Sequence, residues 1–430
     1  MFRLHDRTRR RLNLVVFLLV CVLPTVVLAG WGLWRWSGAY GRAEAHRLSQ
    51  LLGLRVRFQS VRHLRPGAVR YERLELEDPA TGQWVLRCGQ LEAAWQRLPE
   101  ASGNRGASVT LRASQVEAHA PELDQLWRVA HEVMARRHGL DRIRLQATVP
   151  VVRLVDAEGS DPLRRLLVRI AALPQQAEGE LQFHWADRDA SVHVRLVSTD
   201  GEGSPETTWE VTADGPVPCR WAGRWIPASA SLGPESTFAG HFRATRRSGP
   251  WHGELAGRLE GVDLAHLGER YTAHQISGQA KITVEACRFS GQRLEMLSGS
   301  LRAGPGQISD SLVEAASRFL GLVRPTPPRP SALQLTYEQL AFRFCVDERG
   351  VRLWGQCQSP ADGVVLTGPA GPLLGDCGGR PLPLASLVQA CIPPAGPLVS
   401  ATRRSAGILR WLPLPETAGG LGDTAVLTRP

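Results

Sequence analysis

The feature that most constrains this chain is an uninterrupted apolar run close to its N-terminus. Residues 12–34 carry no charged side chain, and Arg11 and Arg35 close the run on its two sides. A helix of this length reaches roughly 35 Å, which is enough to cross the hydrocarbon core of a bilayer. Pro24 would only kink such a helix, because membrane-spanning helices tolerate proline. The run therefore predicts one transmembrane helix over residues 12–34.

The charges on either side of this helix predict its orientation. Arginines crowd residues 1–11, whereas Arg35 and Arg42 beyond the helix are partly balanced by Glu44. Basic flanks remain preferentially on the cytoplasmic side of a membrane, so we expect the body of the chain on the other side. The alternative is a cleaved signal peptide, because residues 27–29 (Val-Leu-Ala) have the small-residue pattern of a cleavage site. Both interpretations export the body.

Composition favours a β-rich body. The 43 glycines and 30 prolines exceed average use, which suits a turn-rich β protein more than a helical one. Of the net charge of +10, roughly +6 lies outside the N-terminal flank and would favour contact with anionic lipid or another acidic envelope polymer, although a general bias towards arginine is the simpler explanation. Four of the 8 cysteines lie between Cys345 and Cys391, so one disulfide there is compatible with an exported body. We expect most of the others to be buried thiols.

Apolar residues alternate with polar ones over much of the body, which is typical of half-buried antiparallel strands. Val56 and Phe58 alternate with arginines, and Leu74 and Leu76 alternate with glutamates. The same pattern predicts further strands at residues 143–154, 181–185, 192–196 and 209–211, and a hairpin that turns at residues 347–350. Between residues 238 and 302, segments punctuated by glycine predict a meander of short strands.

Three helices are expected within this strand pattern, at residues 38–52, 121–138 and 309–322. The predicted organisation is therefore a series of six parts. They are a cytoplasmic N-terminus (1–11), the transmembrane helix (12–34), an amphipathic linker helix (38–52), a β-rich body (53–324), a proline-linked C-terminal β segment that continues the sheet (325–412) and a loose tail (413–430).

The sequence contains no residue pattern typical of an enzyme. His131 and His138 lie seven residues apart on a predicted helix, whereas a zinc metalloprotease needs two histidines four residues apart. His184 lies near Asp187 and Asp189 at a strand end, without the spacing of metal ligands. We recognise no nucleophile elbow and no phosphate-binding loop. We therefore predict no catalytic residues, no cofactor, no metal ion and no nucleic-acid partner.

The order of motifs in the chain resembles that of AsmA-like proteins, a family related to bridge-like lipid transfer proteins. The N-terminal helix leads to residues 48–56 (Leu-Ser-Gln-Leu-Leu-Gly-Leu-Arg-Val), and strand-like segments follow at 61–66, 74–79 and 86–91. Residues 253–322 resemble the C-terminal part of the family, where Gly-x-Leu-x-Gly strands, as in residues 253–257, precede a glycine-rich turn and a helix. The resemblance covers roughly half the chain, and the chain is short for the family.

The resemblance implies a fold that is mainly β with a few helices, in which a curved antiparallel sheet forms an open, taco-like apolar groove. It also implies a role in envelope lipid homeostasis, with phospholipid movement between membranes in some members, and it supplies no catalytic residues. An apolar sheet face can shield acyl chains while the other face meets water. The candidate groove residues are Val56, Phe58, Leu74, Leu76, Phe342 and Phe344. The alternative is that they pack as ordinary core against the helices at 121–138 and 309–322.

Three functions follow from these observations. The first is a non-enzymatic, membrane-anchored lipid-handling protein of AsmA type in the bacterial inner membrane, with its body in the periplasm. Its partners would be the bilayer and phospholipid. The second is an anchored scaffold with a filled β core that recruits other envelope proteins. The third is an exported enzyme with a dispersed site, for which a convergent polar pocket would be the evidence.

Overall fold

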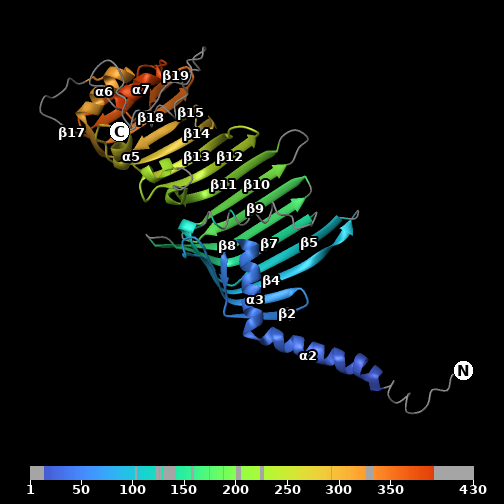
Figure 1. The fold of residues 1–430 in the computed structure, drawn as a ribbon. Helices are drawn as coiled ribbons and strands as arrows, with labels where there is room; N and C mark the ends of the chain where they lie inside the picture. The colour runs from blue at the N-terminus through green and yellow to red at the C-terminus, as the bar shows by residue number, and fades with distance from the viewer. Residues whose placement is uncertain are drawn as a thin grey trace, which may run out of the picture. The chain divides into compact units, whose positions relative to one another are not determined.

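The computed structural model describes residues 14–101, 104–122, 125, 128, 142–155, 159–173, 175–186, 188–199, 205–222, 227–291, 293–325 and 334–391. Over these residues the chain is mainly β, and an N-terminal apolar helix precedes curved, mostly antiparallel sheet (Figure 1). The predicted fold class is thereby confirmed. The chain divides into two compact units, unit 1 (Met1–Pro174) and unit 2 (Gln175–Pro430), and this division falls inside the predicted body at 53–324.

The apolar run forms a helix from Leu14 to Arg35 that is long and apolar enough to cross a membrane. A π-helical turn, η1 (Leu18–Val22), precedes the regular helix α2 (Leu23–Trp36), and the Leu23 N–H donates to the Leu18 carbonyl. Pro24 has no N–H to donate. The Thr25 hydroxyl donates to the Cys21 carbonyl at 2.6 Å, so the polar side chain of this apolar helix is satisfied within the helix.

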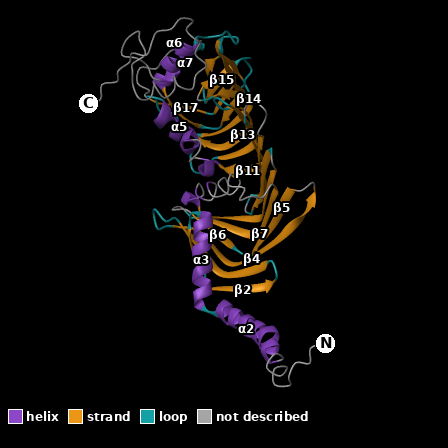
Figure 2. Cartoon of the chain, turned by 45° about the vertical axis from the view of Figure 1, so that its right-hand side comes forward, coloured by secondary structure: helices purple, strands orange, loops and turns teal. Residues whose placement is uncertain are grey.

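The amphipathic helix α3 spans Gly38–Leu52, as predicted. Ser37 is extended and ends α2, while Gly53 ends α3 with a left-handed backbone (φ 66°), a conformation that glycine adopts without strain. In Figure 2, α3 lies across the strands of unit 1 and meets α2 at an angle.

The described sheet of unit 1 combines antiparallel pairings with two parallel ones. Strands β1 (Arg55–Arg57) and β2 (Ser60–Arg65) pair with successive parts of β3 (Ala68–Glu77), and β3 pairs with β4 (Trp84–Ala101). Strands β5 (Asn104–Ala113) and β6 (Val116–His119) pair with β4 on one side and in parallel with β7 (Arg142–Val155) on the other. Strand β8 (Ser160–Leu173) pairs with β7. The helix predicted at 121–138 lies mostly outside the described residues, after a 3-10 turn η2 at Ala120–Glu122.

Unit 2 is built on a meander in which each strand pairs with the next. Its strands are β9 (Gln176–Trp185), β10 (Ala190–Thr199), β11 (Glu206–Pro218), β12 (Thr237–Arg247), β13 (His252–Asp263), β14 (Gln279–Ser290) and β15 (Arg293–Ala303). Two 3-10 turns, η3 (Cys219–Ala222) and η4 (Pro227–Leu232), separate β11 from β12. The predicted meander is confirmed, although β12 to β15 are 11 or 12 residues long rather than short.

The C-terminal part of unit 2 extends this sheet and adds helices. Strand β18 (Gln339–Asp347) pairs with β15, and it forms the predicted hairpin with β19 (Gly350–Gly355). Strands β20 (Val364–Gly368) and β21 (Gly371–Gly375) follow, while β16 (Gly306–Ser309) and β17 (Gln334–Tyr337) form a separate pair. The helices α5 (Leu264–Tyr271), α6 (Asp310–Leu320) and α7 (Leu384–Cys391) complete a hydrophobic core with β14, β15, β18 and β19. Figure 2 shows the three helices at this end of the unit.

Candidate functional site

One face of the unit 2 sheet carries apolar side chains in rows that run from strand to strand. On β9, Leu181 and Phe183 share this face, and the register places them opposite Val194 and Val192 of β10. Directly opposed residues of antiparallel strands lie on the same side of a sheet. One complete row consists of Leu181, Val194, Val211, Phe242, Leu255, Cys287, Leu297 and Val346.

Glycines interrupt the neighbouring rows where aromatic rings lie over the backbone. A Cβ added at Gly257 would lie 2.8 Å from the Phe238 ring, and one added at Gly299 would lie 3.1 Å from the Phe344 ring. A Cβ at Gly253 would overlap the Phe289 ring. The glycines of the Gly-x-Leu-x-Gly segment at 253–257 therefore leave room for phenylalanine rings, which provide the apolar surface in their place.

The opposite face of the unit 2 sheet is charged, and ion pairs cross its strands. They are His193–Glu180, Arg195–Glu178, Arg243–Glu210, Arg247–Glu206, Lys281–Glu260 and Arg343–Glu285. Pairs as exposed as these contribute little to stability, about 0–1 kcal/mol each. They identify this face as the one that meets water.

The apolar face of β9 to β13 is only partly buried, because Val192, Leu196 and Ala244 are buried but other residues of the same face are not. Leu181, Phe183, Val211, Phe242 and Leu255 all retain intermediate exposure. The clustered hydrophobic core of unit 2 lies with α5, α6 and α7, over β14, β15, β18 and β19. A contiguous, partly exposed apolar surface rimmed by charge is typical of a binding surface for apolar ligands or partners.

Unit 1 has the same division into an apolar and a charged face. One apolar row crosses the sheet as Trp95, Val109, Leu145 and Ile170, and the next as Ala93, Leu111, Ala147 and Val168. Ion pairs between Arg70 and Glu92, and between Arg87 and Glu75, lie on the other face. Trp95 retains 49% exposure, so part of this apolar face also remains accessible.

The predicted groove residues lie on these apolar faces, in two groups. In unit 1, Val56 and Leu76 are register partners and are buried with Leu74, while Phe58 contacts Tyr71 with ring centroids 5.3 Å apart. In unit 2, the ring centroids of Phe342 and Phe344 lie 6.2 Å apart, and both rings pack against the helix-covered core. The groove residues predicted from the sequence therefore lie where helices cover the two apolar faces. The prediction missed the half-exposed row at Leu181, Val194, Val211, Phe242 and Leu255, although its period-two alternation was visible.

Helix α3 covers the apolar face of unit 1 at β1 to β3. The Ser49 hydroxyl accepts from the Val56 N–H at 2.9 Å, and the Tyr71 hydroxyl donates to Glu44 Oε1 at 3.2 Å. Burial and the Glu44 carboxylate raise the pKa of Tyr71, so this phenol stays protonated and keeps donating. These polar contacts fix α3 against the strands.

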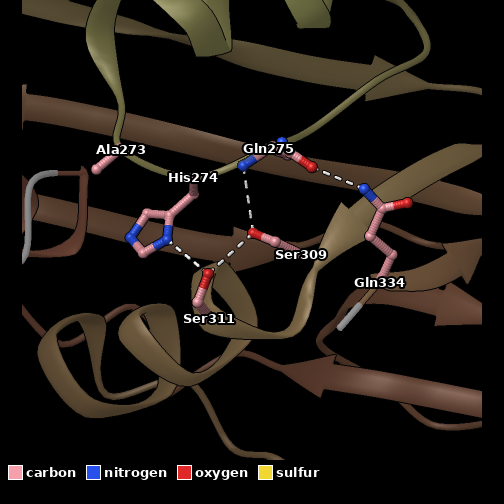
Figure 3. Close-up of a pocket in the computed structure, with 6 residues that line it drawn as sticks. All are labelled: Ala273, His274, Gln275, Ser309, Ser311 and Gln334. Carbon is pink, nitrogen blue, oxygen red and sulfur yellow. Dashed lines mark hydrogen bonds between the residues drawn. The ribbon is translucent and has the colours of Figure 1, made fainter. Parts of the chain in front are cut away.

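A small polar recess of about 550 Å³ lies in unit 2 beside α6 (Figure 3). His274 is buried there, with Nδ1 2.9 Å from the Ser311 hydroxyl and Nε2 3.1 Å from the Ala390 carbonyl. Ser309 and Ser311 are also hydrogen-bonded to each other, and Gln334 donates to Gln275 at 2.7 Å. Because both ring nitrogens have partners, His274 connects α7 to the start of α6, and the arrangement is that of a structural link.

The other residues considered from the sequence do not form a site. His131, His138 and Asp187 lie outside the described residues. Across the ranges that the structure describes, no three His, Cys, Asp or Glu side chains converge as metal ligands. All eight cysteines are free, so the disulfide considered among the four cysteines of residues 345–391 is not formed. Burial raises the pKa of the Cys391 thiol to about 11, which keeps it protonated.

Comparison of the chain with protein-family models, with curated proteins and with solved structures finds no match.

Proposed function

We propose that this chain is a non-enzymatic, membrane-anchored cell-envelope protein of AsmA type that binds phospholipid acyl chains on its apolar sheet faces. The apolar N-terminal helix would hold it in the inner membrane, with the body on the periplasmic side. Its role would be envelope lipid homeostasis, including movement of phospholipid along the apolar rows. The strand order, the Gly-x-Leu-x-Gly segment and the anchor support the AsmA-like assignment.

The observation that carries this proposal is the half-buried row on the apolar face of β9 to β13, from Leu181 to Leu255. A sheet face that had only to stabilise the fold would be packed against a second layer. Here Phe242 and Leu255 stay partly exposed on one side, while ion pairs such as Arg243–Glu210 occupy the other. Acyl chains would complete the missing apolar layer, with a gain of about 25 cal/mol for each Å² of apolar surface removed from water.

A second candidate is an anchored scaffold that recruits envelope proteins. The helix-covered core around Val313, Val351 and Val388 favours it, because this end of unit 2 is filled by the chain's own side chains. In this case the half-buried rows would be covered by a protein partner. The two candidates differ in whether lipid occupies the apolar face.

The experiment is purification of the full chain in mild detergent, followed by lipid mass spectrometry. We expect phospholipid to co-purify with the wild-type protein. Leu255→Glu places a carboxylate on the apolar face and should strongly reduce the bound lipid, because a charge among acyl chains is costly. Equal amounts of lipid in wild type and Leu255→Glu would refute lipid binding at this face.

Ala256→Glu is the matched control. Ala256 is the next residue of β13, is exposed and lies on the charged face. The same carboxylate there should leave both the bound lipid and the unfolding midpoint unchanged. A protein partner that co-purifies without lipid, and is lost in Leu255→Glu alone, would favour the scaffold instead.

A further inference from the structure

The hairpin of β2 and β3 lies against the junction between the membrane helix and α3. Trp34 near the end of α2 contacts Tyr40 of α3, with ring centroids 5.0 Å apart. The Tyr40 hydroxyl is hydrogen-bonded to His63 Nε2 of β2 at 2.7 Å. Figure 2 shows β2 beside this junction. Two successive contacts therefore connect the hairpin to the point where the apolar helix ends.

The hairpin presents an exposed leucine at an irregularity of the strand. His63 pairs with Val69 and Arg65 with Ala68, so Leu64 is an extra residue that bulges from β2. Leu64 is 47% exposed. Bulges re-aim side chains, and here the bulge directs an apolar side chain outwards near the end of a membrane helix.

Basic residues flank Leu64 in the sequence, and a tryptophan lies beside the hairpin tip at Gly67. Arg62 and Arg65 are both exposed. Arg62 Nε lies 3.6 Å from Glu72 Oε1, whereas Arg65 forms no ion pair with any described residue. At the tip, Gly67 adopts a left-handed backbone (φ 78°) and accepts a hydrogen bond from the Trp95 N–H at 2.8 Å. The Trp95 indole is itself 49% exposed.

We propose that this hairpin tip, with Leu64, Arg62, Arg65 and Trp95, docks on the surface of the bilayer and binds anionic phospholipid headgroups. Leu64 enters the boundary between headgroups and acyl chains, where Trp95 also finds an environment suited to an amphipathic ring. Arg62 and Arg65 bind lipid phosphate, to which each arginine contributes roughly fivefold in binding near an anionic surface. The inference rests on the membrane anchor of the proposed function.

A photo-crosslinking experiment on the full chain tests this docking. The protein is placed in nanodiscs of phosphatidylcholine and phosphatidylglycerol, with p-benzoylphenylalanine at position 64. Position 323 is the matched site, because Val323 is an apolar residue of 58% exposure in unit 2. A crosslinker at position 27, in the apolar helix, reports whether this helix lies in the membrane. We expect lipid adducts at positions 27 and 64, with a several-fold lower yield at 323.

The arginines are tested in the same nanodiscs. Arg62→Gln with Arg65→Gln should lower the phosphatidylglycerol adduct at position 64 several-fold and leave the yield at position 27 unchanged. Adducts at 27 but none at 64 above the level of 323 would overturn the docking alone. Absence of adducts at 27 would overturn the membrane anchor and the docking with it. Equal yields with and without the arginine changes would overturn headgroup recognition.

Discussion

Single glycines decide how the apolar face of unit 2 is built. No side chain fits at Gly257, because an added Cβ would lie 2.5 Å from the Ala239 carbonyl and 2.8 Å from the Phe238 ring. Gly257→Ala must therefore displace the neighbouring strand or the ring, and we expect a loss of about 1–3 kcal/mol in the free energy of unfolding. Urea denaturation of the full chain in detergent measures it. Gly304→Ala, which meets nothing within 4 Å, should stay within about 0.5 kcal/mol of wild type.

His274 gives the fold a dependence on pH. Burial lowers its pKa below the ordinary value of 6.5, so below pH 6.5 the unfolded chain binds a proton that the folded chain excludes. Stability from this residue is therefore present above pH 6.5 and falls as the pH drops below it. We expect the difference in unfolding midpoint between neutral and mildly acidic buffer to shrink in His274→Gln. An unchanged difference would contradict the assignment, and His252→Gln, at an exposed position, is the control.

Helix α3 depends on its polar contacts with the sheet, because none of its residues is fully buried. Tyr71→Phe removes the hydrogen bond to Glu44 and leaves this carboxylate with Arg47 at 3.7 Å. A hydrogen bond to a charged group contributes about 1.5–3 kcal/mol. We expect faster hydrogen exchange of the amides at 42–52 in this variant. Exchange in β13 and β14 of unit 2 should not change, and a uniform increase over the whole chain would refute a local role.

The elements predicted correctly from the sequence are those that their own residues indicate. Helix α3 has the predicted bounds because its apolar stripe ends at a glycine, and the β18–β19 hairpin turns at the predicted residues 347–350. The meander was predicted with strands that are too short, since its glycines resemble breaks in the sequence but lie under phenylalanine rings. Helices α5 and α7 were missed, because eight-residue helices gain their stability from core contacts rather than from their own sequence.

The candidate site was only partly predictable for a related reason. Alternation assigned Leu74 and Phe344 to the apolar side of their strands. Whether a helix covers each position depends on contacts between distant segments, such as Phe344 with the core of α6 and α7. The parallel pairing of β5 and β6 with β7 is equally non-local. No pattern in the sequence between these strands specifies how β5 and β6 align with β7.

At the scale of the whole molecule, the apolar helix should decide where the protein resides. Val27 lies in the middle of this helix and is 60% exposed, so in a membrane it would face lipid. Val27→Arg would cost about 2.5–3.5 kcal/mol on insertion. We expect the variant to be depleted from the carbonate-resistant membrane fraction, whereas Ala39→Arg, in the first turn of α3, should remain there. Full retention of Val27→Arg would contradict a membrane-spanning role.

The strand-to-strand pairing of unit 2 allows the number of strands in its sheet to change during evolution. Because each strand from β9 to β15 pairs with its neighbour in the chain, gain or loss of one hairpin leaves the direction of every other strand unchanged. It also preserves which side of each strand is apolar. Each added hairpin would widen the sheet by two strand spacings, roughly 9–10 Å. Duplication of short gene segments could thus change the width of the sheet without redesign of its surface chemistry.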